Sequence, residues 1–308
     1  MPARVFMSSG DMIADRRFDF ARDLQLRGDL VGAADLFAQA SELAPGFAAA
    51  WFALGEVREQ LGERAAAVAA FRQAQMTDPS DHNGAGLRLM RLGAAELAGM
   101  PPTYVSTLFN QYAPKFEAAL VDELGYRGPH LLFKAVLAAR AAIGKPAFFS
   151  RAIDLGCGTG LVARAFAAQT DEIIGIDLSP RMIELAKATG LYTELEVAEI
   201  VAGLGRKAEA CADLILAADV MVYVHDMVPL LREVARVLMP GGMLAFTTET
   251  HSADGVVLGA GLRYAHSVAT VRTAIEAAGL TLHQLETASA RIESGVPAPG
   301  LVAVAGRD

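Results

Sequence analysis

The most constraining feature of the sequence is a glycine-rich segment, AIDLGCGTGLVARAF, at residues 152–166. An apolar run ends at Asp154, and Gly156, Gly158 and Gly160 follow at every second position, before a helix-like pattern of small and apolar residues. A strand, a glycine turn and a helix in this order are typical of a cofactor site, because a chain without Cβ atoms lets a ligand lie against its backbone. The spacing is tighter than the G-x-G-x-x-G of dinucleotide sites, so the segment alone leaves the cofactor open.

Strand and helix patterns alternate from about residue 130 onward. We expect helices near 130–142, 159–168, 179–188, 226–238 and 267–278, and strands near 151–155, 172–176, 194–198, 213–217, 242–249, 280–286 and 299–306. This alternation predicts a parallel sheet with helices on both faces. Ligands of such sheets bind beyond the carboxyl ends of the strands.

Acidic side chains follow several of these strands, at the edge where a ligand would bind. Asp177 ends the second strand, and a carboxylate there can accept hydrogen bonds from ribose hydroxyls. Glu199 follows the third strand and could accept one from an adenine amino group, with Ile200 packed on the ring. Asp154 and Asp219 end the first and fourth strands, where each could contact the cofactor or only support a turn.

Four segments in this order, DLGCGTG, IIGIDLSP, ADLILAADV and LMPGGMLAF, resemble the successive motifs of class I S-adenosylmethionine-dependent methyltransferases. The resemblance covers about residues 130–308 and implies an α/β Rossmann-like fold with a seven-stranded, mostly parallel sheet whose last strand is antiparallel. It implies S-adenosylmethionine as cofactor and S-adenosylhomocysteine as product. The residues that it assigns to the cofactor are Asp154, Gly156, Gly158, Gly160, Asp177, Leu178, Glu199, Ile200 and Asp219. The family usually has aspartate where this chain has Glu199.

The first hundred residues contain an internal repeat. Five positions recur with an offset of 34 residues: Gly28, Ala33, Phe37, Ala40 and Pro45 return as Gly62, Ala67, Phe71, Ala74 and Pro79. This period and these positions resemble the tetratricopeptide repeat, which implies an all-α domain of two repeats and a capping helix. We expect helices near 16–28, 31–43, 48–62, 64–77 and 83–98. The order of the two parts resembles bacterial methyltransferases that carry N-terminal tetratricopeptide repeats.

The role of the repeats stays open between two alternatives. Two repeats are fewer than the roughly three that an independent array needs, which favours docking on the second domain. Repeat arrays also present concave surfaces to partners, which favours a protein or peptide ligand.

A pair of prolines at residues 101–102 marks a domain boundary, because proline interrupts a helix. The sequence therefore predicts repeats over 1–100, an aromatic-rich linker over 101–129 and a methyltransferase domain over 130–308. In the linker, helices near 103–112 and 114–124 would carry Tyr104, Phe109, Tyr112 and Phe116. Such a stripe of aromatic residues is either core or, just before a cofactor domain, a lid over the site.

Composition narrows the class of partner. The net charge of −8 and the lack of any lysine- or arginine-rich run argue against a nucleic acid. No apolar stretch reaches the ~18 residues of a membrane span, and the N-terminus lacks an apolar signal region. The two cysteines, Cys157 and Cys211, cannot form a disulfide framework, which fits a reducing compartment. We expect a cytoplasmic protein with no bound metal and no membrane partner.

Several polar residues are candidates for the site of the methyl acceptor. Tyr223 and His225 follow the fourth strand, and Arg263, Tyr264 and His266 form a polar group before a helix. Arg263 suits a carboxylate or phosphate, and the two histidines and Tyr264 are candidate catalytic groups, since histidine can act as a base. The alternative for the second group is an ordinary loop whose next residue, a serine, caps the helix.

Two functions therefore stay open. The first is methyl transfer to a small molecule, or to a group on a carrier or partner protein, with the repeats mediating docking. The second is a repeat-based interaction module whose S-adenosylmethionine-binding domain is regulatory or inactive. The intact glycine turn favours the first.

Overall fold

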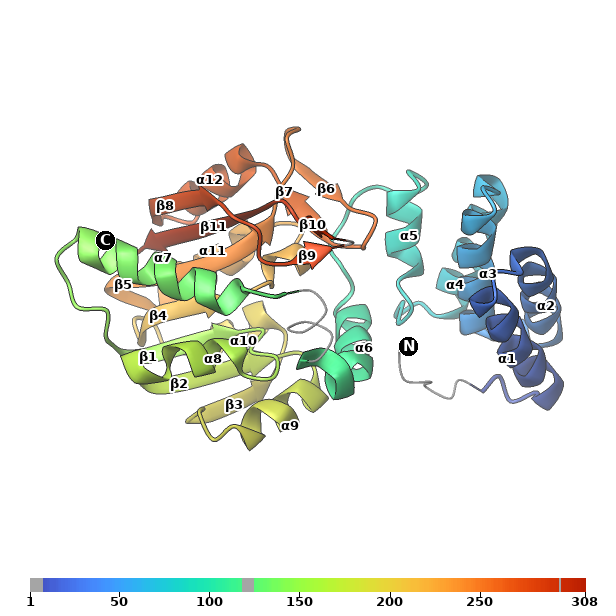
Figure 1. Cartoon of the computed structure of the whole chain (residues 1–308), viewed down its shortest axis with the longest axis horizontal. Helices are drawn as coiled ribbons and strands as arrows, with labels where there is room; N and C mark the ends of the chain where they lie inside the picture. The colour runs from blue at the N-terminus through green and yellow to red at the C-terminus, as the bar shows by residue number, and fades with distance from the viewer. Residues whose placement is uncertain (1–7, 118–124, 294) are drawn as a thin grey trace. The chain divides into compact units, whose positions relative to one another are not determined.

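The computed structural model describes residues 8–117, 125–293 and 295–308 (Figure 1). The chain forms two compact units, Met1–Thr107 and Leu108–Asp308. Their boundary falls inside helix α6 (Pro102–Tyr112), so the expected linker is shared between the units. Most of the second helix expected in that linker, 114–124, lies outside the described residues.

The first unit is a series of helices joined by short turns. Its described helices before α6 are α1 (Met12–Leu26), α2 (Leu30–Leu43), α3 (Ala48–Gln60), α4 (Arg64–Thr77) and α5 (Ala85–Arg91). Helix α1 packs against α2, and α3 packs against α4. Gly28 and Gly62 make the turn inside each pair with φ angles of 84° and 78°, a conformation that glycine adopts without strain. The fifth helix is shorter than the expected 83–98, because the chain turns at Gly93, whose φ is 64°.

The recurring aromatic and small residues form the core of this unit. Phe37 and Phe71 are completely buried. A Cβ atom added to Gly55 would lie 2.6 Å from the ring of Phe71, so α3 can approach this ring only because position 55 is glycine. Helices α2 and α4 each end two residues before a proline, as expected for a residue that disfavours helix at its predecessor. The structure therefore supports the repeat that the sequence indicates.

The second unit is built on one large sheet. Seven of its strands follow the order β3-β2-β1-β4-β5-β11-β8. Their bounds are β1 (Phe149–Leu155), β2 (Thr170–Asp177), β3 (Glu194–Val197), β4 (Ala212–Ala217), β5 (Leu238–Glu249), β8 (Thr281–Thr287) and β11 (Gly300–Gly306). The pairs from β3 to β5 are parallel, and β11 runs antiparallel to both β5 and β8. The predicted sheet with an antiparallel last strand is confirmed.

Helices cover both faces of the sheet (Figure 1). One core lies under α7 (Gly128–Ala142) and α8 (Leu161–Phe166), and the other lies under α10 (Ile200–Gly205), α11 (Val228–Val237) and α12 (Val268–Ala277). Helix α9 (Pro180–Ala188) connects β2 with β3. The strand β1 contributes to both cores, because successive side chains of a strand point to opposite faces. Ala152 packs in the core under α7 and α8, and Ile153 packs in the core under α10, α11 and α12.

The segment around Tyr264 differs from the ordinary loop that was one alternative. Strand β7 (Tyr264–His266) pairs with the end of β5 through Ala265 and Glu249, and β6 (Val256–Leu258) pairs with β7. Ser267 caps α12, since its hydroxyl accepts the Thr270 N–H at 3.1 Å. A further hairpin, β9 (Ile292–Glu293) and β10 (Val296–Pro297), precedes β11.

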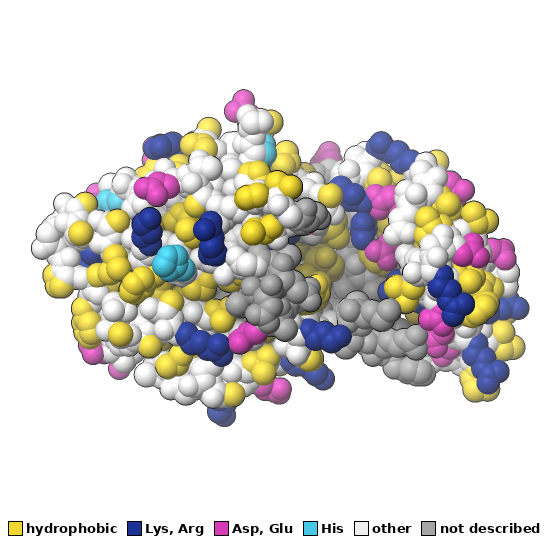
Figure 2. Space-filling model, in the orientation of Figure 1, with side chains coloured by type: hydrophobic (Ala, Val, Ile, Leu, Met, Phe, Trp, Pro, Cys, Tyr) yellow, Lys and Arg dark blue, Asp and Glu magenta, His cyan; other side chains and the backbone are white. Residues whose placement is uncertain are grey.

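Basic and acidic side chains are both scattered over the face of the molecule that Figure 2 shows. No helix among the described residues is both long enough and apolar enough to cross a membrane.

Candidate functional site

The glycine turn lies between β1 and α8, at the carboxyl end of the central strand. Gly156, Gly158 and Gly160 have φ angles of 62°, 52° and 92°. A Cβ on Gly156 would lie 2.5 Å from a methyl of Val220, the third residue after β4. Position 156 therefore needs glycine both for its backbone angle and for this close packing. The three glycines have no side chains, so a ligand could contact the backbone directly at the edge of the sheet where ligands of this fold class bind.

Asp177 ties this turn to the end of β2. One of its oxygens, Oδ2, accepts the Gly158 N–H at 2.9 Å, and the other, Oδ1, accepts the Ser179 N–H at 2.8 Å. Burial raises the pKa of this carboxyl. Each oxygen retains a lone pair, because a carboxylate oxygen can accept more than one hydrogen bond. Contact with ribose stays a prediction, and the position of Asp177 beside the glycine turn is consistent with it.

Asp154 is completely buried beneath the same turn. The hydroxyl of Tyr192 donates to its Oδ2 at 2.7 Å, but its Oδ1 has no partner among the described residues. Burial raises the pKa of Asp154 to about 7. The hydroxyl of Thr159, three residues along the turn from Gly156, is also buried without a described partner. Since buried polar atoms are nearly always paired, these two atoms fit a polar ligand on the turn.

The other residues assigned to the cofactor lie along the same edge. Glu199 accepts the Ala202 N–H at 2.9 Å and so caps α10, which leaves its second oxygen for a ligand. Ile200 is half-buried against the core, and Leu178 is half-buried directly after Asp177. Their contacts with adenine and ribose stay predictions.

The aromatic residues before the domain divide into three groups. Phe109 and Phe116 have ring centroids 6.1 Å apart, and Phe109 meets Tyr223 at 5.3 Å. Phe116 lies over the glycine turn, 3.7 Å from where a Cβ of Gly158 would be. Tyr112 is 45% exposed. Tyr104 instead packs in the first unit, where its ring leaves no room for a side chain at position 84.

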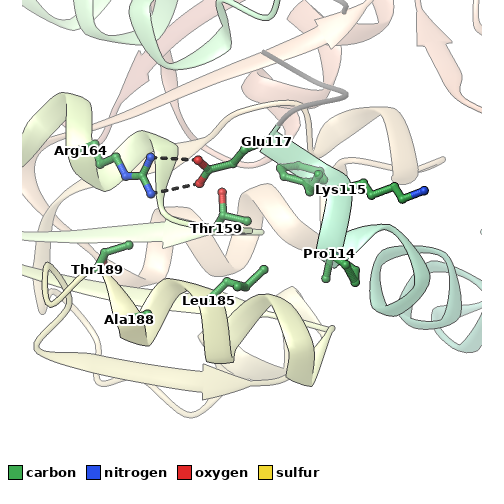
Figure 3. Close-up of a pocket in the computed structure, with 10 residues that line it drawn as sticks. Pro114, Lys115, Glu117, Thr159, Arg164, Leu185, Ala188 and Thr189 are labelled. Atoms are coloured by element: carbon green, nitrogen blue, oxygen red, sulfur yellow. Dashed lines mark hydrogen bonds and ion pairs between the residues drawn. The ribbon is translucent and has the colours of Figure 1, made fainter. Parts of the chain in front are cut away.

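A pocket of about 360 Å³ opens beside the glycine turn, between the segment 113–117 and helices α8 and α9 (Figure 3). Thr159 lines it from the turn. Across it, Arg164 of α8 makes a two-pronged ion pair with Glu117, at 3.0 and 3.2 Å. A second contact of the aromatic segment is Asn110, whose side-chain oxygen accepts the Ser179 hydroxyl at 2.7 Å. The segment that carries Phe109 and Phe116 is thus attached to the turns that follow both β1 and β2.

The candidate acceptor residues gather at the ends of β4 and β5, around Arg263. Its Nε donates to Glu249 at 2.6 Å, one terminal nitrogen donates to the Tyr223 hydroxyl at 2.9 Å, and the other pairs with Asp219. Arg291, which the sequence analysis did not select, bonds the same Glu249 oxygen at 2.7 Å. Asp219 holds a φ of 61°, uncommon for a residue other than glycine and frequent at functional sites.

Tyr264 and His266 lie inside the fold. Both are completely buried, and His225 lies beside Tyr264 with ring centroids 5.4 Å apart. Both nitrogens of His266 are used: Nε2 faces the Val224 carbonyl at 2.9 Å and Nδ1 faces the Thr248 hydroxyl at 3.0 Å. Burial lowers the pKa of His266 to about 4. These contacts favour structural roles for Tyr264 and His266, while half-buried His225 remains a candidate.

Several residues at this site were not predicted, among them Tyr192, Asn110, Glu249 and Arg291. Tyr192 lies two residues before β3, and nothing in its sequence context distinguishes it from a surface residue. Among the described residues, no group of three or more histidine, cysteine, aspartate or glutamate side chains is placed to hold a metal.

Comparison with known families agrees with this geometry. Residues 153–246, from β1 to β5, match the methyltransferase domain, and residues 24–89 match the tetratricopeptide repeat. The second unit contains a methyltransferase domain. The expectation of S-adenosylmethionine as the cofactor is confirmed at the level of this domain family, and the repeats of the first unit are confirmed as tetratricopeptide repeats.

Curated relatives of the methyltransferase domain include ubiquinone biosynthesis O-methyltransferases. The protein from Xanthomonas oryzae pv. oryzae is 29% identical over 102 residues, which are 32% of this chain and 43% of that protein. The protein from Alkalilimnicola ehrlichii is 33% identical over 101 residues, 32% of this chain and 41% of its own. The chain thus spans less than half the length of these relatives.

Solved structures share the fold of the second unit. The cyclase SpnF superposes with a TM-score of 0.55 at 17% identity, covering 69% of this chain and 99% of its own. A Haloferax volcanii protein solved in complex with a methyltransferase activator gives a TM-score of 0.51 at 18% identity, covering 64% of this chain and 96% of its own. Because one of these two proteins is described as a cyclase, the fold alone does not establish methyl transfer.

Proposed function

We propose that the methyltransferase domain transfers a methyl group from S-adenosylmethionine to an oxygen atom of a small molecule, free or bound to a carrier. The observation that carries this proposal is the buried Oδ1 of Asp154, which has no hydrogen-bond partner among the described residues and lies beneath a turn of three glycines. The choice of oxygen rests on the relatives, which are named O-methyltransferases.

The residues of the turn fit the parts of the cofactor. Asp154 would accept from the ammonium group of the methionine part, because a buried carboxylate favours a charged donor. Asp177 would accept from the ribose hydroxyls, and Glu199 from the adenine amino group through the oxygen that does not cap α10. When bound, the cofactor supplies an electrophilic methyl group on a sulfonium. The task of this chain is then to align the acceptor and exclude water.

Phe109, Phe116 and Tyr223 would cover the reacting groups. Their rings run from the glycine turn to the end of β4, and a layer of rings would remove water from the site. We propose that the segment 108–117 acts as a lid that opens for exchange of the cofactor. Tyr104, which packs in the first unit, and exposed Tyr112 would contribute less.

The repeats would serve docking, either on the methyltransferase domain or on a partner protein that presents the acceptor. The second candidate function is an interaction module that only senses the cofactor. Its support is the fold shared with SpnF, a protein described by another activity.

Calorimetric titration with S-adenosylhomocysteine tests the proposal. Asp177→Ala should weaken binding by roughly 10- to 100-fold, the range expected for losing hydrogen bonds to a charged group. Asp171→Ala is the matched control, because Asp171 is an exposed acid near the other end of the same strand. Circular dichroism of Asp177→Ala guards against misfolding, because the substitution leaves the Gly158 and Ser179 N–H groups without the carboxylate that accepts them.

Incubation with radiolabelled S-adenosylmethionine and fractionated small-molecule extract then separates the two functions. Transfer of label to an extracted compound supports the enzyme. Cofactor binding without any labelled acceptor supports the sensing module, and unchanged affinity in Asp177→Ala contradicts the site.

A further inference from the structure

Tyr192 lies in the turn that connects α9 with β3, and its neighbours are held on both sides. The Leu191 N–H donates to the Thr189 hydroxyl at 3.2 Å. On the other side, the N–H and the hydroxyl of Thr193 both donate to the Ile173 carbonyl of β2, at 2.9 and 3.1 Å. The backbone of Tyr192 is therefore fixed by bonds that its own side chain does not make.

The ring of Tyr192 reaches Asp154 past two glycines. Gly175 is the register partner of Asp154 on the adjacent strand β2. A Cβ atom added to Gly175 would lie 2.9 Å from the Tyr192 ring, and one added to Gly160 would lie 3.3 Å from it. The missing side chains thus leave the space that the ring occupies.

The hydroxyl of Tyr192 contacts one oxygen of Asp154. It donates to Oδ2 at 2.7 Å, and burial raises the pKa of Tyr192, so at neutral pH it stays a phenol with a proton to donate. The N–H groups of Cys157 and Gly158, on the adjacent turn, donate to residues at the end of β2 instead. Since Oδ2 is held, the carboxylate has a fixed orientation, and Oδ1 is the oxygen without a partner among the described residues.

The groups around Asp154 act on its charge in opposite directions. Burial raises its pKa to about 7, and the negative charge of Asp177 raises it as well. Cys157 and Tyr126, whose pKa values burial also raises, stay neutral and supply no positive charge. The Tyr192 hydrogen bond lowers the pKa of Asp154, because it stabilises the carboxylate form. Without this bond, Asp154 would hold its proton to a higher pH.

We infer that Tyr192 is a positioning residue of the cofactor site: its hydroxyl orients the Asp154 carboxylate and favours the ionised form that the ammonium group of the cofactor requires. The inference rests on the proposed function, in which Asp154 accepts from that ammonium group. A protonated Asp154 carries no charge for the ammonium, so the ligand and a proton compete for this carboxylate. Tyr192 shifts the competition toward the ligand near neutral pH.

Calorimetric titration of the full chain with S-adenosylhomocysteine, at pH 7 and at pH 9, tests this inference. Tyr192→Phe keeps the ring and removes the hydroxyl. The variant should bind about three- to tenfold more weakly than the natural chain at pH 7, the range expected for one hydrogen bond to a charged group. At pH 9 Asp154 should be ionised in both proteins, so the difference should shrink below about twofold. The ratio of the two dissociation constants cancels the titration of the ligand's own amine, since both proteins bind the same ligand.

Thr193→Val is the matched control. It removes a hydroxyl from the adjacent residue, but that hydroxyl donates to the Ile173 carbonyl and not to Asp154. The affinity of this variant should equal that of the natural chain at both pH values. In an Asp154→Asn background, the effect of Tyr192→Phe should lose its pH dependence, because the carboxylate that titrates is gone.

A loss of affinity that is the same at pH 7 and pH 9 would show that Tyr192 only supports the fold, and it overturns the inference, as does an unchanged affinity at pH 7. A pH-dependent loss that persists in the Asp154→Asn background, or that appears equally in Thr193→Val, also overturns it. If Tyr192→Phe does not fold, the double variant with Asp154→Asn decides. A folded double variant supports the inference, because the hydroxyl is then needed only to pair the buried carboxylate, and an unfolded one contradicts it.

Two other results concern the proposed function instead. They are failure of the unmodified protein to bind S-adenosylhomocysteine, and equally tight binding by Asp154→Asn alone. Either one contradicts the assignment of Asp154 to the cofactor, so the failure of the proposed function and the failure of this inference are distinguishable.

Discussion

Replacing Asp154 with asparagine should stabilise the ligand-free protein while weakening its binding of the cofactor. Asp154 is completely buried, and one of its oxygens has no described partner. Burial raises its pKa from 3.8 to about 7. An asparagine keeps the shape and can still accept the Tyr192 hydroxyl, but it carries no charge to bury.

The sign and size of the effect follow from this pKa. Between pH 3.8 and about 7 the folded state holds a proton on Asp154 that the unfolded chain releases, so this group makes the protein lose stability as the pH rises through that window. One pKa unit corresponds to about 1.4 kcal/mol, so a shift of about three units sets a ceiling of about 4 kcal/mol. The variant should therefore equal the natural chain near pH 4 and exceed it increasingly up to pH 7, with a constant difference above.

Scanning calorimetry of both proteins across this pH range measures the difference. Fluorescence is unsuitable, because the single tryptophan, Trp51, lies in the repeat unit and does not report on the second unit. Asp171→Asn, an exposed acid on β2, should show no such pH dependence. In parallel, the Asp154 variant should bind S-adenosylhomocysteine roughly 10-fold or more weakly, the effect of losing one charge-assisted hydrogen bond. A variant that gains no stability at pH 8, or that binds the ligand equally well, refutes the assignment.

Three further outcomes are expected. Burial lowers the pKa of His266 from 6.5 to about 4, so between pH 6.5 and 4 the unfolded chain binds a proton that the folded chain does not. The free energy of unfolding should therefore fall by at most about 3 kcal/mol as the pH drops through this range. Urea unfolding of His266→Asn should not show this pH-dependent loss. Gly55→Ala should destabilise the repeat unit by about 1–3 kcal/mol, because the added methyl group would be too close to the Phe71 ring. Unfolding followed by Trp51 fluorescence measures this loss, and an unchanged unfolding free energy would contradict the prediction. Arg164→Ala breaks the ion pair with Glu117, whose partners are 49% and 40% exposed, so the unfolding free energy should change by less than about 1 kcal/mol; a larger change by denaturant titration would contradict this.

Periodicity and turn residues were enough to predict the fold. The offset of 34 residues predicted paired helices, because each glycine that recurs makes a turn and each phenylalanine that recurs is buried. In the second unit, the seven strands lie within a few residues of their expected positions. The hairpin strands β6, β7, β9 and β10 were not predicted, since two or three residues are too few to show an alternating pattern.

The polar cluster around Arg263 could not be predicted in the same way. Glu249, Arg263 and Arg291 belong to different segments of the chain. The pairing of β7 with the end of β5 brings Arg263 to Glu249, and Arg291, directly before β9, reaches the same carboxylate. In the sequence, Arg263 beside Tyr264 and His266 suggested a binding site for a carboxylate or phosphate. In the structure, Arg263 is paired with Glu249 and Asp219, which offset its charge, so its role toward an acceptor stays a prediction.

The four acids at the strand ends illustrate why position alone does not determine role. Asp177 spends both oxygens on backbone N–H groups, Glu199 caps a helix with one, and Asp219 is paired with arginine. Of the four acids, Asp154 alone is completely buried with an oxygen that has no partner in the part of the chain that the structure describes. Its charge should therefore cost the most, and a cationic ligand there would restore the most stability. Residue type and spacing mark all four equally. The availability of partners separates them, and we propose Asp154 as the group whose pairing the cofactor completes.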